Sequence, residues 1–192
     1  MVFGYGLPPT SEAGFDAFAR RLTPEFHAAL STAEPLSEIA GYGQTANRWR
    51  HHERLPAWPS GYAALGDSVC TFNPLYGQGM TVAVMEAVAL HDLLAERGAV
   101  ADLGAHLRRR IADLLTVPRR IATSEDYRYP ITAGPPRSSA LRVMHWYADR
   151  VIRAALRNPE VHTRWMRVVN LIDQPATLLA PGVFGPALTA PG

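Results

Sequence analysis

The stretch from Gly61 to Gly98 constrains the fold more than any other part of this 192-residue chain. It opens with a short apolar run, Tyr62–Leu65, which has the length of a β-strand. A glycine-containing loop follows, and from Gly79 onward apolar residues recur at helical spacing. Gly98 predicts the end of that helix, because glycine readily takes the left-handed conformation that closes helices. The sequence therefore predicts a strand–loop–helix unit.

The loop of this unit has the features of a binding site for a flat ligand that carries hydroxyl groups. Asp67 stands at the carboxyl end of the predicted strand, where its carboxylate can accept hydrogen bonds from a polyol. Gly77 and Gly79 let the backbone approach a flat ligand closely, because no Cβ intervenes. The helix start at Met80 and Thr81 offers unpaired N–H groups and the positive end of the helix dipole, which favour negative charge.

The order of these residues resembles a motif of a known family. The set Gly66-Asp67, Asn73-Pro74 and Gly77-Gln78-Gly79-Met80 resembles the second flavin motif of FAD-dependent monooxygenases of the aromatic-hydroxylase type. The resemblance runs from Gly4 to about Pro181, but its specific residues lie between Gly66 and Ala87. An alternative interpretation is a strand–loop–helix unit whose glycines only form a tight turn.

The resemblance implies a set of cofactor-binding residues: Gly66, Asp67, Pro74, Gly77, Gly79, Met80 and Thr81. In the family, the acid corresponding to Asp67 hydrogen-bonds the ribityl chain of FAD. Pro74 and the two following glycines would shape the loop along the isoalloxazine ring. The N–H groups of Met80 and Thr81 would stabilise negative charge near N1 and O2 of reduced flavin.

The activity implied by the resemblance is that of an FAD-dependent oxidoreductase, in particular a monooxygenase (hydroxylase) of a small organic or aromatic substrate. In this family NAD(P)H reduces FAD, and dioxygen then supplies one oxygen atom to the substrate. A relative that uses the same motif for reduction or halogenation stays open, because substrate and outcome are set outside it. No residue has a clear claim to proton transfer, so the catalytic residues are unassigned.

A second element of this family, a Gly-x-Gly-x-x-Gly turn that binds the ADP half of FAD, has no convincing copy here. Residues 41–46 match Gly-x-Gly-x-x-Ala, but residues 47–52 do not continue as an amphipathic helix. We therefore expect an α+β fold, mostly helical with a small mixed sheet, as an incomplete C-terminal portion of an FAD/NAD(P)-binding flavoprotein fold. A second chain supplying the Rossmann half is a possible partner. The alternative is a non-catalytic fragment or partner subunit that binds no flavin alone.

The rest of the chain predicts helices around the flavin motif. We expect one compact unit with three segments: 1–60, a remnant of the substrate-side sheet with a helical hairpin; 61–98, the strand–loop–helix flavin motif; and 99–192, a helical region. Residues 1–9 are predicted to be the end of a strand and a turn, and short strands are predicted at Leu36–Tyr42 and Gln44–Trp49. Further helices are predicted at Ala99–Val117, with a kink or interruption at Pro118, from Ser138 or Ser139 to about Arg157, and at Asn158–Asp173. Three arginines precede the motif and could anchor a carboxylate or phosphate, or be solvated charges: Arg48, Arg50 and Arg54.

Composition restricts the remaining classes of function. A net charge of +2 predicts no nucleic-acid partner, and no apolar run approaches the ~18 residues of a spanning helix. The single Cys70 excludes an intrachain disulfide and fits a reducing cytoplasm, where we expect the protein, since no signal peptide is visible. The basic residues are all arginine, which is typical of GC-rich bacterial genes.

No metal site is predicted, because histidine and cysteine pairs at ligand spacing are missing. The apolar tail Ala176–Pro186 leaves a membrane-surface enzyme of lipids as a third hypothesis.

Overall fold

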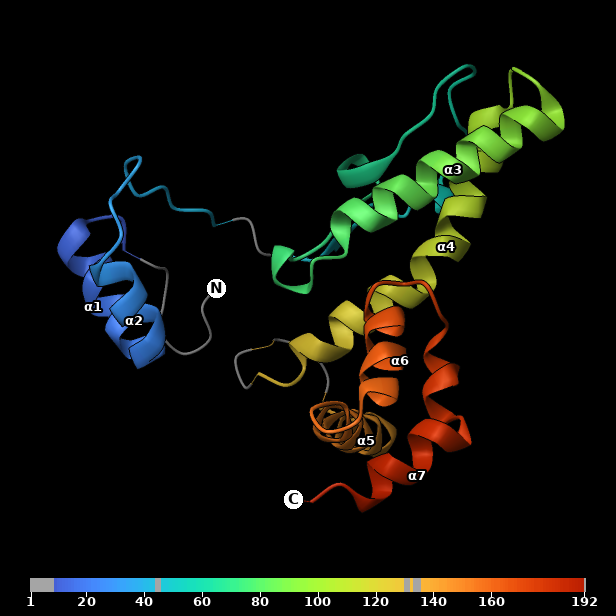
Figure 1. Ribbon diagram of the computed structural model, residues 1–192. Coiled ribbons are helices and arrows are strands. Elements are labelled where there is room, and N and C mark those ends of the chain that lie inside the picture. Colours follow the sequence, from blue (N-terminus) through green and yellow to red (C-terminus); the bar gives the residue numbers. More distant parts are fainter. Residues whose placement is uncertain (1–8, 44–45, 130–131, 133–135, 192) are drawn as a thin grey trace. The chain divides into compact units, whose positions relative to one another are not determined.

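The computed structural model describes residues 9–43, 46–129, 132 and 136–191, and it divides the chain into two compact units, residues 1–45 and 46–192. The sequence predicted one compact unit, so this expectation is corrected. Helices predominate, and the described residues contain one two-stranded sheet, so the chain is α+β as predicted (Figure 1).

The N-terminal unit is a helical hairpin, as the sequence predicts. Its helices are α1 (Glu12–Leu22) and α2 (Pro24–Ser31). The Ser11 hydroxyl accepts the Gly14 N–H and caps α1, and Thr23 caps α2 in the same way. Such caps satisfy N–H groups that lack partners inside the helix. Local sequence signals therefore suffice to define this hairpin.

The strands predicted before residue 50 are mostly wrong. Residues 36–42 form no strand, and only β1 (Arg48–Trp49) pairs, antiparallel, with β2 (Cys70–Thr71). The predicted small mixed sheet is thus an antiparallel ribbon of two short strands. The strand end predicted within residues 1–9 falls on residues 1–8, which lie outside the described residues. Residues 44 and 45 of the strand predicted at Gln44–Trp49 also lie outside them. A strand needs a neighbour to satisfy its N–H and C=O groups, and the sequence pattern alone does not supply one.

The strand predicted at Tyr62–Leu65 is also wrong. Leu65 has extended backbone angles (φ −138°, ψ 162°), but no strand of the described residues lies beside it. The Tyr62 carbonyl instead accepts the indole N–H of Trp58 at 2.8 Å. It also lies against Gly104, in the helix formed by Leu103–Asp126. This segment is therefore an extended strap over a helix.

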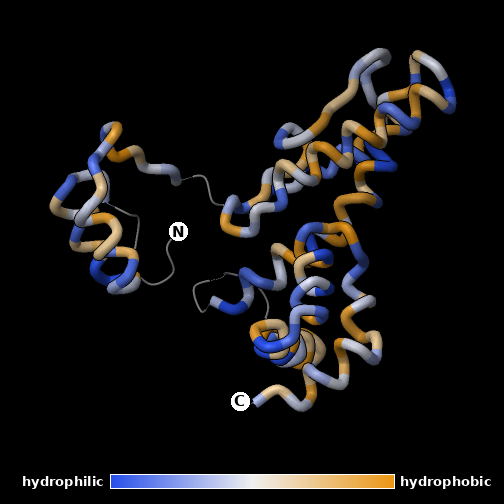
Figure 2. Tube along the Cα trace, in the orientation of Figure 1, coloured by the Kyte–Doolittle hydropathy of each residue, from blue (hydrophilic) through white to orange (hydrophobic). Residues whose placement is uncertain are grey.

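Two long helices of the second unit, α3 (Gly79–Arg97) and α4 (Leu103–Asp126), pack against each other and run in opposite directions (Figure 1). Gly98 ends α3 with a φ of +70°, as predicted. The core between them contains Val82, Ala89, Leu93, Leu107, Ile111 and Leu115. Figure 2 shows hydrophobic and hydrophilic residues alternating along both helices, as expected when one face of each is buried.

The sequence predicts a kink or an interruption at Pro118; the interruption does not occur, because α4 continues through this residue. A proline inside a helix removes one backbone hydrogen bond and usually bends or ends it. Here Pro118 is itself buried, and Leu115 and Ala122 on either side of it are fully buried as well. Burial of this apolar face offsets the lost hydrogen bond.

Three further helices and a 3₁₀ turn complete the second unit. They are α5 (Ser139–Ala155), α6 (Pro159–Val169), the turn η4 (Pro175–Leu179) and α7 (Pro181–Thr189). They share a second core around Val151, Val161 and Val183. The His145 Nε2 donates to the Ser124 carbonyl of α4 at 3.0 Å and joins this group to α4. No helix among the described residues has the length and apolarity needed to cross a membrane.

Candidate functional site

Gly66 and Asp67 begin a 3₁₀ turn, η2 (Gly66–Ser68), which packs against α3. Gly66 has a φ of +60°, a conformation that strains residues with a Cβ. The backbone of Asp67 is held, because its carbonyl accepts Nη1 of Arg50 at 2.5 Å and the Thr71 hydroxyl at 3.3 Å. The Asp67 residue itself is exposed, so its carboxylate is accessible to a ligand. Arg50 thus braces the turn.

The loop after this turn is open on its outer side. A second 3₁₀ turn, η3 (Pro74–Tyr76), ends at Gly77, which has a φ of +67°. The Asn73 side chain accepts the Leu75 N–H at 3.1 Å and shapes the turn. A Cβ on Gly77 or Gly79 would meet no atom within 4 Å. This open space is what close approach of a planar ligand to the backbone requires.

The inner side of the same loop is held by a network of side chains that the sequence did not indicate. Oδ2 of Asp126, at the end of α4, accepts Nδ2 of Asn47 at 2.7 Å, and its Oδ1 accepts the Tyr76 hydroxyl at 2.5 Å. The Asn47 Oδ1 in turn accepts the Asn73 N–H at 2.8 Å. Burial raises the pKa of Tyr76, and the hydrogen bond to Asp126 raises it further. The phenol therefore stays a donor, and the loop is anchored from within.

The start of α3 presents backbone donors. The Val82 N–H bonds to the Gln78 carbonyl at 3.0 Å, and no side-chain hydrogen bond caps the helix at Gln78. The N–H groups of Gly79, Met80 and Thr81 precede the first bond of the helical ladder. Met80 is 84% exposed, whereas Gly79 and Thr81 are half-buried. A helix N-terminus without a side-chain cap attracts negative charge.

Gln78 joins the loop to the C-terminal helices. Its side chain is buried, and Nε2 donates to the Val169 carbonyl at 3.5 Å. Leu171, just beyond α6, has a φ of +60° and packs against the first core. The end of α6 therefore contacts the loop at Gln78.

Glu86 of α3 is a further site residue that was not predicted. Its side chain is fully buried, and Oε2 accepts the Gly66 N–H at 2.5 Å. Burial raises the pKa of Glu86, the hydrogen bond from Gly66 lowers it, and the charge of Asp67 raises it. A signal was present, since Glu86 is four residues after Val82 and three before Ala89, on the buried face.

Metal and thiol chemistry find no support in the part of the chain that the structure describes. No three His, Cys, Asp or Glu side chains are placed there to hold a metal ion. Burial raises the pKa of Cys70 to about 11, so its thiol carries little thiolate at neutral pH. Cys70 is a core residue.

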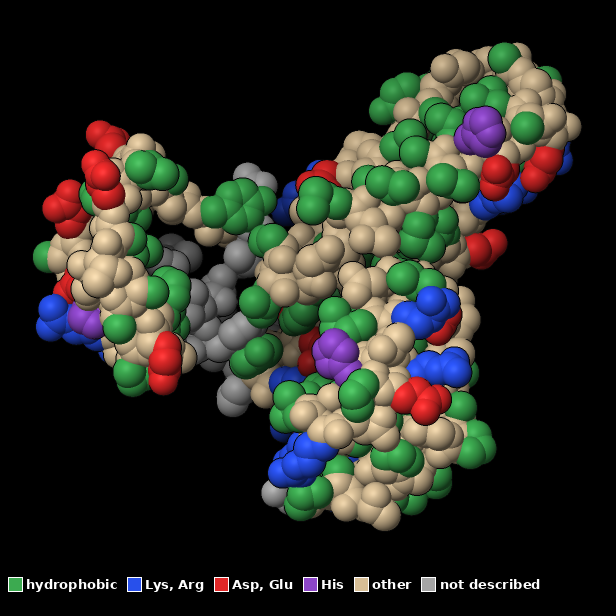
Figure 3. Space-filling view, in the orientation of Figure 1, with side chains coloured by type: hydrophobic (Ala, Val, Ile, Leu, Met, Phe, Trp, Pro, Cys, Tyr) green, Lys and Arg blue, Asp and Glu red, His purple; other side chains and the backbone are tan. Residues whose placement is uncertain are grey.

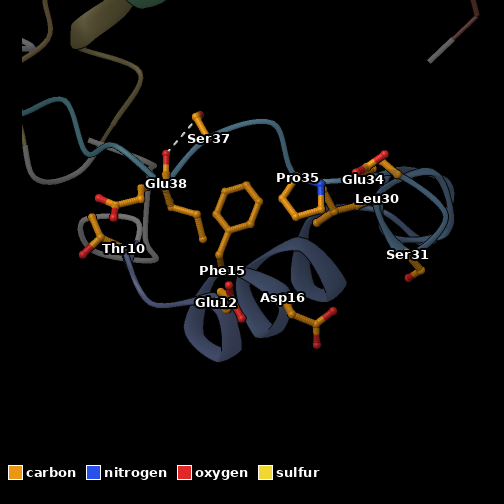
Figure 4. A pocket seen from close by; sticks show the side chains of 12 residues that line it. Thr10, Glu12, Phe15, Asp16, Leu30, Ser31, Glu34, Pro35, Ser37 and Glu38 are labelled. Carbon is orange, nitrogen blue, oxygen red and sulfur yellow. Dashed lines mark hydrogen bonds between the residues drawn. The ribbon is translucent and has the colours of Figure 1, made fainter.

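A cavity of about 620 Å³ lies within the N-terminal unit (Figure 4). Figure 4 shows Phe15 of α1 pointing toward Pro35 and the segment 34–39. Carboxylates from four residues also line this cavity: Glu12, Asp16, Glu34 and Glu38. It includes none of the predicted cofactor-binding residues, all of which belong to the other unit.

No protein-family model matches the chain. It is 29% identical over 184 residues to Protein Rv3254 of Mycobacterium tuberculosis (strain ATCC 25618 / H37Rv). The similarity covers 94% of this chain, which spans 39% of that protein's length. The name of the relative states no activity.

Proposed function

We propose that this chain is the flavin-facing, C-terminal portion of an FAD-dependent oxidoreductase, a monooxygenase of a small organic or aromatic substrate. One observation carries the proposal. Residues 66–81 combine an exposed acid, a glycine-lined open side and an uncapped helix start, all braced from beneath. A polyol attached to a planar ring that gains negative charge on reduction matches these three features.

The chain's own residues would bind and orient the flavin. Asp67 accepts hydrogen bonds from ribityl hydroxyls, and Pro74, Gly77 and Gly79 form the surface along the ring. The N–H groups of Met80 and Thr81 stabilise negative charge on the pyrimidine side. When bound, FAD supplies the redox chemistry, with NAD(P)H as reductant. Because the ADP-binding turn is not identified in this chain, we expect weak binding of intact FAD by the chain alone.

The proposal is tested with FMN, which carries the ring and the ribityl chain without the ADP half. We expect purified protein to bind FMN, read from the change that binding causes in the flavin absorbance band at about 450 nm, and Asp67→Ala to weaken binding at least ~10-fold by removing a charge-assisted hydrogen bond. Lumichrome has the ring without the ribityl chain, so its affinity should not change in the Asp67→Ala variant. Asp113→Ala, on the exposed side of α4, is the matched control.

Two outcomes would contradict this assignment. One is a protein that binds neither FMN nor lumichrome. The other is an Asp67→Ala variant that binds FMN as tightly as Asp113→Ala does, because the exposed acid would then have no part in binding.

A second candidate function is that of a partner subunit that binds flavin only with another polypeptide. An exposed apolar stripe on α3 favours it, formed by Met80, Val84 (63% exposed) and Val88 (53% exposed) at four-residue spacing. Figure 3 shows hydrophobic side chains gathered over α3. Exposed stripes of this kind commonly mark protein interfaces. Since the chain spans 39% of its relative, we propose that the stripe contacts a polypeptide carrying the ADP-binding half.

The stripe is tested by mixing the chain with the remainder of the Mycobacterium tuberculosis relative, beyond the segment that this chain matches. We expect a one-to-one complex in sedimentation, and its loss in Val84→Glu, because a buried unpaired charge opposes association. Val143→Glu on α5 is the control, since Val143 is also 63% exposed. If both variants behave alike, or if no complex forms, the stripe is not the interface.

A further inference from the structure

Glu86 is placed to control the shape of the turn that carries Asp67. The residue belongs to α3, and its side chain, 0% exposed, reaches the Gly66 N–H at 2.5 Å. The bond is made to the residue directly before Asp67, and that residue has a φ of +60°. An ideal Cβ on Gly66 would lie 3.8 Å from the Cβ of Ala83, so the turn sits directly on α3.

We propose that Glu86 is a positioning residue for the flavin loop: by accepting the Gly66 N–H it holds the left-handed turn and keeps the Asp67 carboxylate facing outward. The ligand named here rests on the proposed function, whereas the geometry of the turn does not. Asp67 would contact the ligand, and Glu86 would act through it.

The second carboxyl oxygen of Glu86 carries a cost that a packing role alone would not require. Oε1 is buried and has no hydrogen-bond partner among the described residues. An apolar side chain would fill the same space without the cost of an unpaired polar atom. A carboxyl group at this position is explained by the N–H that Oε2 accepts.

The titration of Glu86 supplies a signature that a packing role would not give. Asp67 of the turn and Cys70 of β2 face it, with Arg50 and Arg119 acting on Cys70. Because the folded pKa is raised above 4.5, the folded state holds the proton longer than the unfolded chain does. Stability is therefore full below that ordinary value and falls as pH rises through the raised pKa.

The test follows the Gly66 amide by NMR in the flavin-free chain. We expect its proton shift to titrate with a midpoint above 4.5 in the wild type and to show no such step in Glu86→Gln. Hydrogen exchange at Gly66 should rise roughly tenfold in Glu86→Ala, and Glu86→Gln should retain protection, since its amide oxygen still accepts the bond. Val82→Ala, which removes buried volume from the same helix face, should leave this amide unchanged.

FMN affinity then separates the two claims. We expect Glu86→Ala to weaken FMN binding about as much as Asp67→Ala does, and Glu86→Gln to restore it. Unchanged protection of Gly66 in Glu86→Ala would overturn the positioning role. If the wild type binds no FMN while Gly66 behaves as expected, the proposed function fails and the positioning of the turn stands.

Discussion

A Gly104→Ala variant is expected to lose about 3 kcal/mol of unfolding free energy, the upper end of the usual cost of overpacking. A Cβ at this position would lie 1.9 Å from the Tyr62 carbonyl oxygen and 2.6 Å from the Trp58 Nε1. Those two atoms are themselves hydrogen-bonded at 2.8 Å, so neither can yield alone. The strap leading to Gly66 must therefore move off α4. Urea unfolding followed by circular dichroism measures the loss.

Gly185 of α7 provides the matched control for this substitution. It is also a helical glycine, but a Cβ there would meet no atom within 4 Å. Gly185→Ala should change stability by less than about 1 kcal/mol, because alanine favours the helix over glycine while the following Pro186 disfavours helical geometry in a residue that carries a Cβ. Equal stability of the Gly104→Ala and Gly185→Ala variants would show that the strap does not pack closely on α4.

An Asp126→Ala variant is expected to lose about 2–3 kcal/mol and to release the loop of residues 73–78. Asp126 accepts one hydrogen bond from Asn47 and one from Tyr76, and both partners are only partly exposed. Removing the carboxylate leaves both donors without an acceptor. Urea unfolding gives the stability, and hydrogen exchange at the Tyr76 amide reports the local release.

Two variants show whether this loss is specific to the network. Asp113→Ala on the exposed face of the same helix should change stability by less than about 0.5 kcal/mol. Tyr76→Phe should cost about 1 kcal/mol, and it should add little to Asp126→Ala, since both remove the same bond. Full additivity of the two losses would mean that the Tyr76–Asp126 bond contributes nothing.

The helices of this protein could be predicted from sequence because their signals are local. Ser11 and Asn158 cap the helices that follow them, and Gly98 ends α3. The strands could not, because a strand is stabilised by a neighbour that a local pattern does not identify. The run Tyr62–Leu65 has strand composition, yet its Tyr62 carbonyl bonds to the Trp58 indole and no strand lies beside it among the described residues.

In the candidate site, too, the residues with local sequence signals were predicted and those that depend on distant partners were not. Asp67, Gly77 and Met80 follow one another in a short motif, and all three are exposed in the structure. The groups beneath them, Glu86 and Asp126, were missed. Carboxylates in helices normally face solvent, so burial of these two depends on distant partners. Asp126 meets Asn47 across 79 positions of sequence, and no local pattern reports such a contact.

The unbroken passage of α4 through Pro118 places two anchors on its last turn. The Ser124 carbonyl accepts a hydrogen bond from His145 of α5, and two residues later the Asp126 carboxylate accepts one from Tyr76 of the loop. Two residues of helix advance only about 3 Å, so the contacts with His145 and with the loop are made from the same helical turn. Ordering of the loop around a ligand would therefore change the contact between α4 and the C-terminal helices. A molecule that displaced those helices would, in return, lower the affinity of the loop for its ligand.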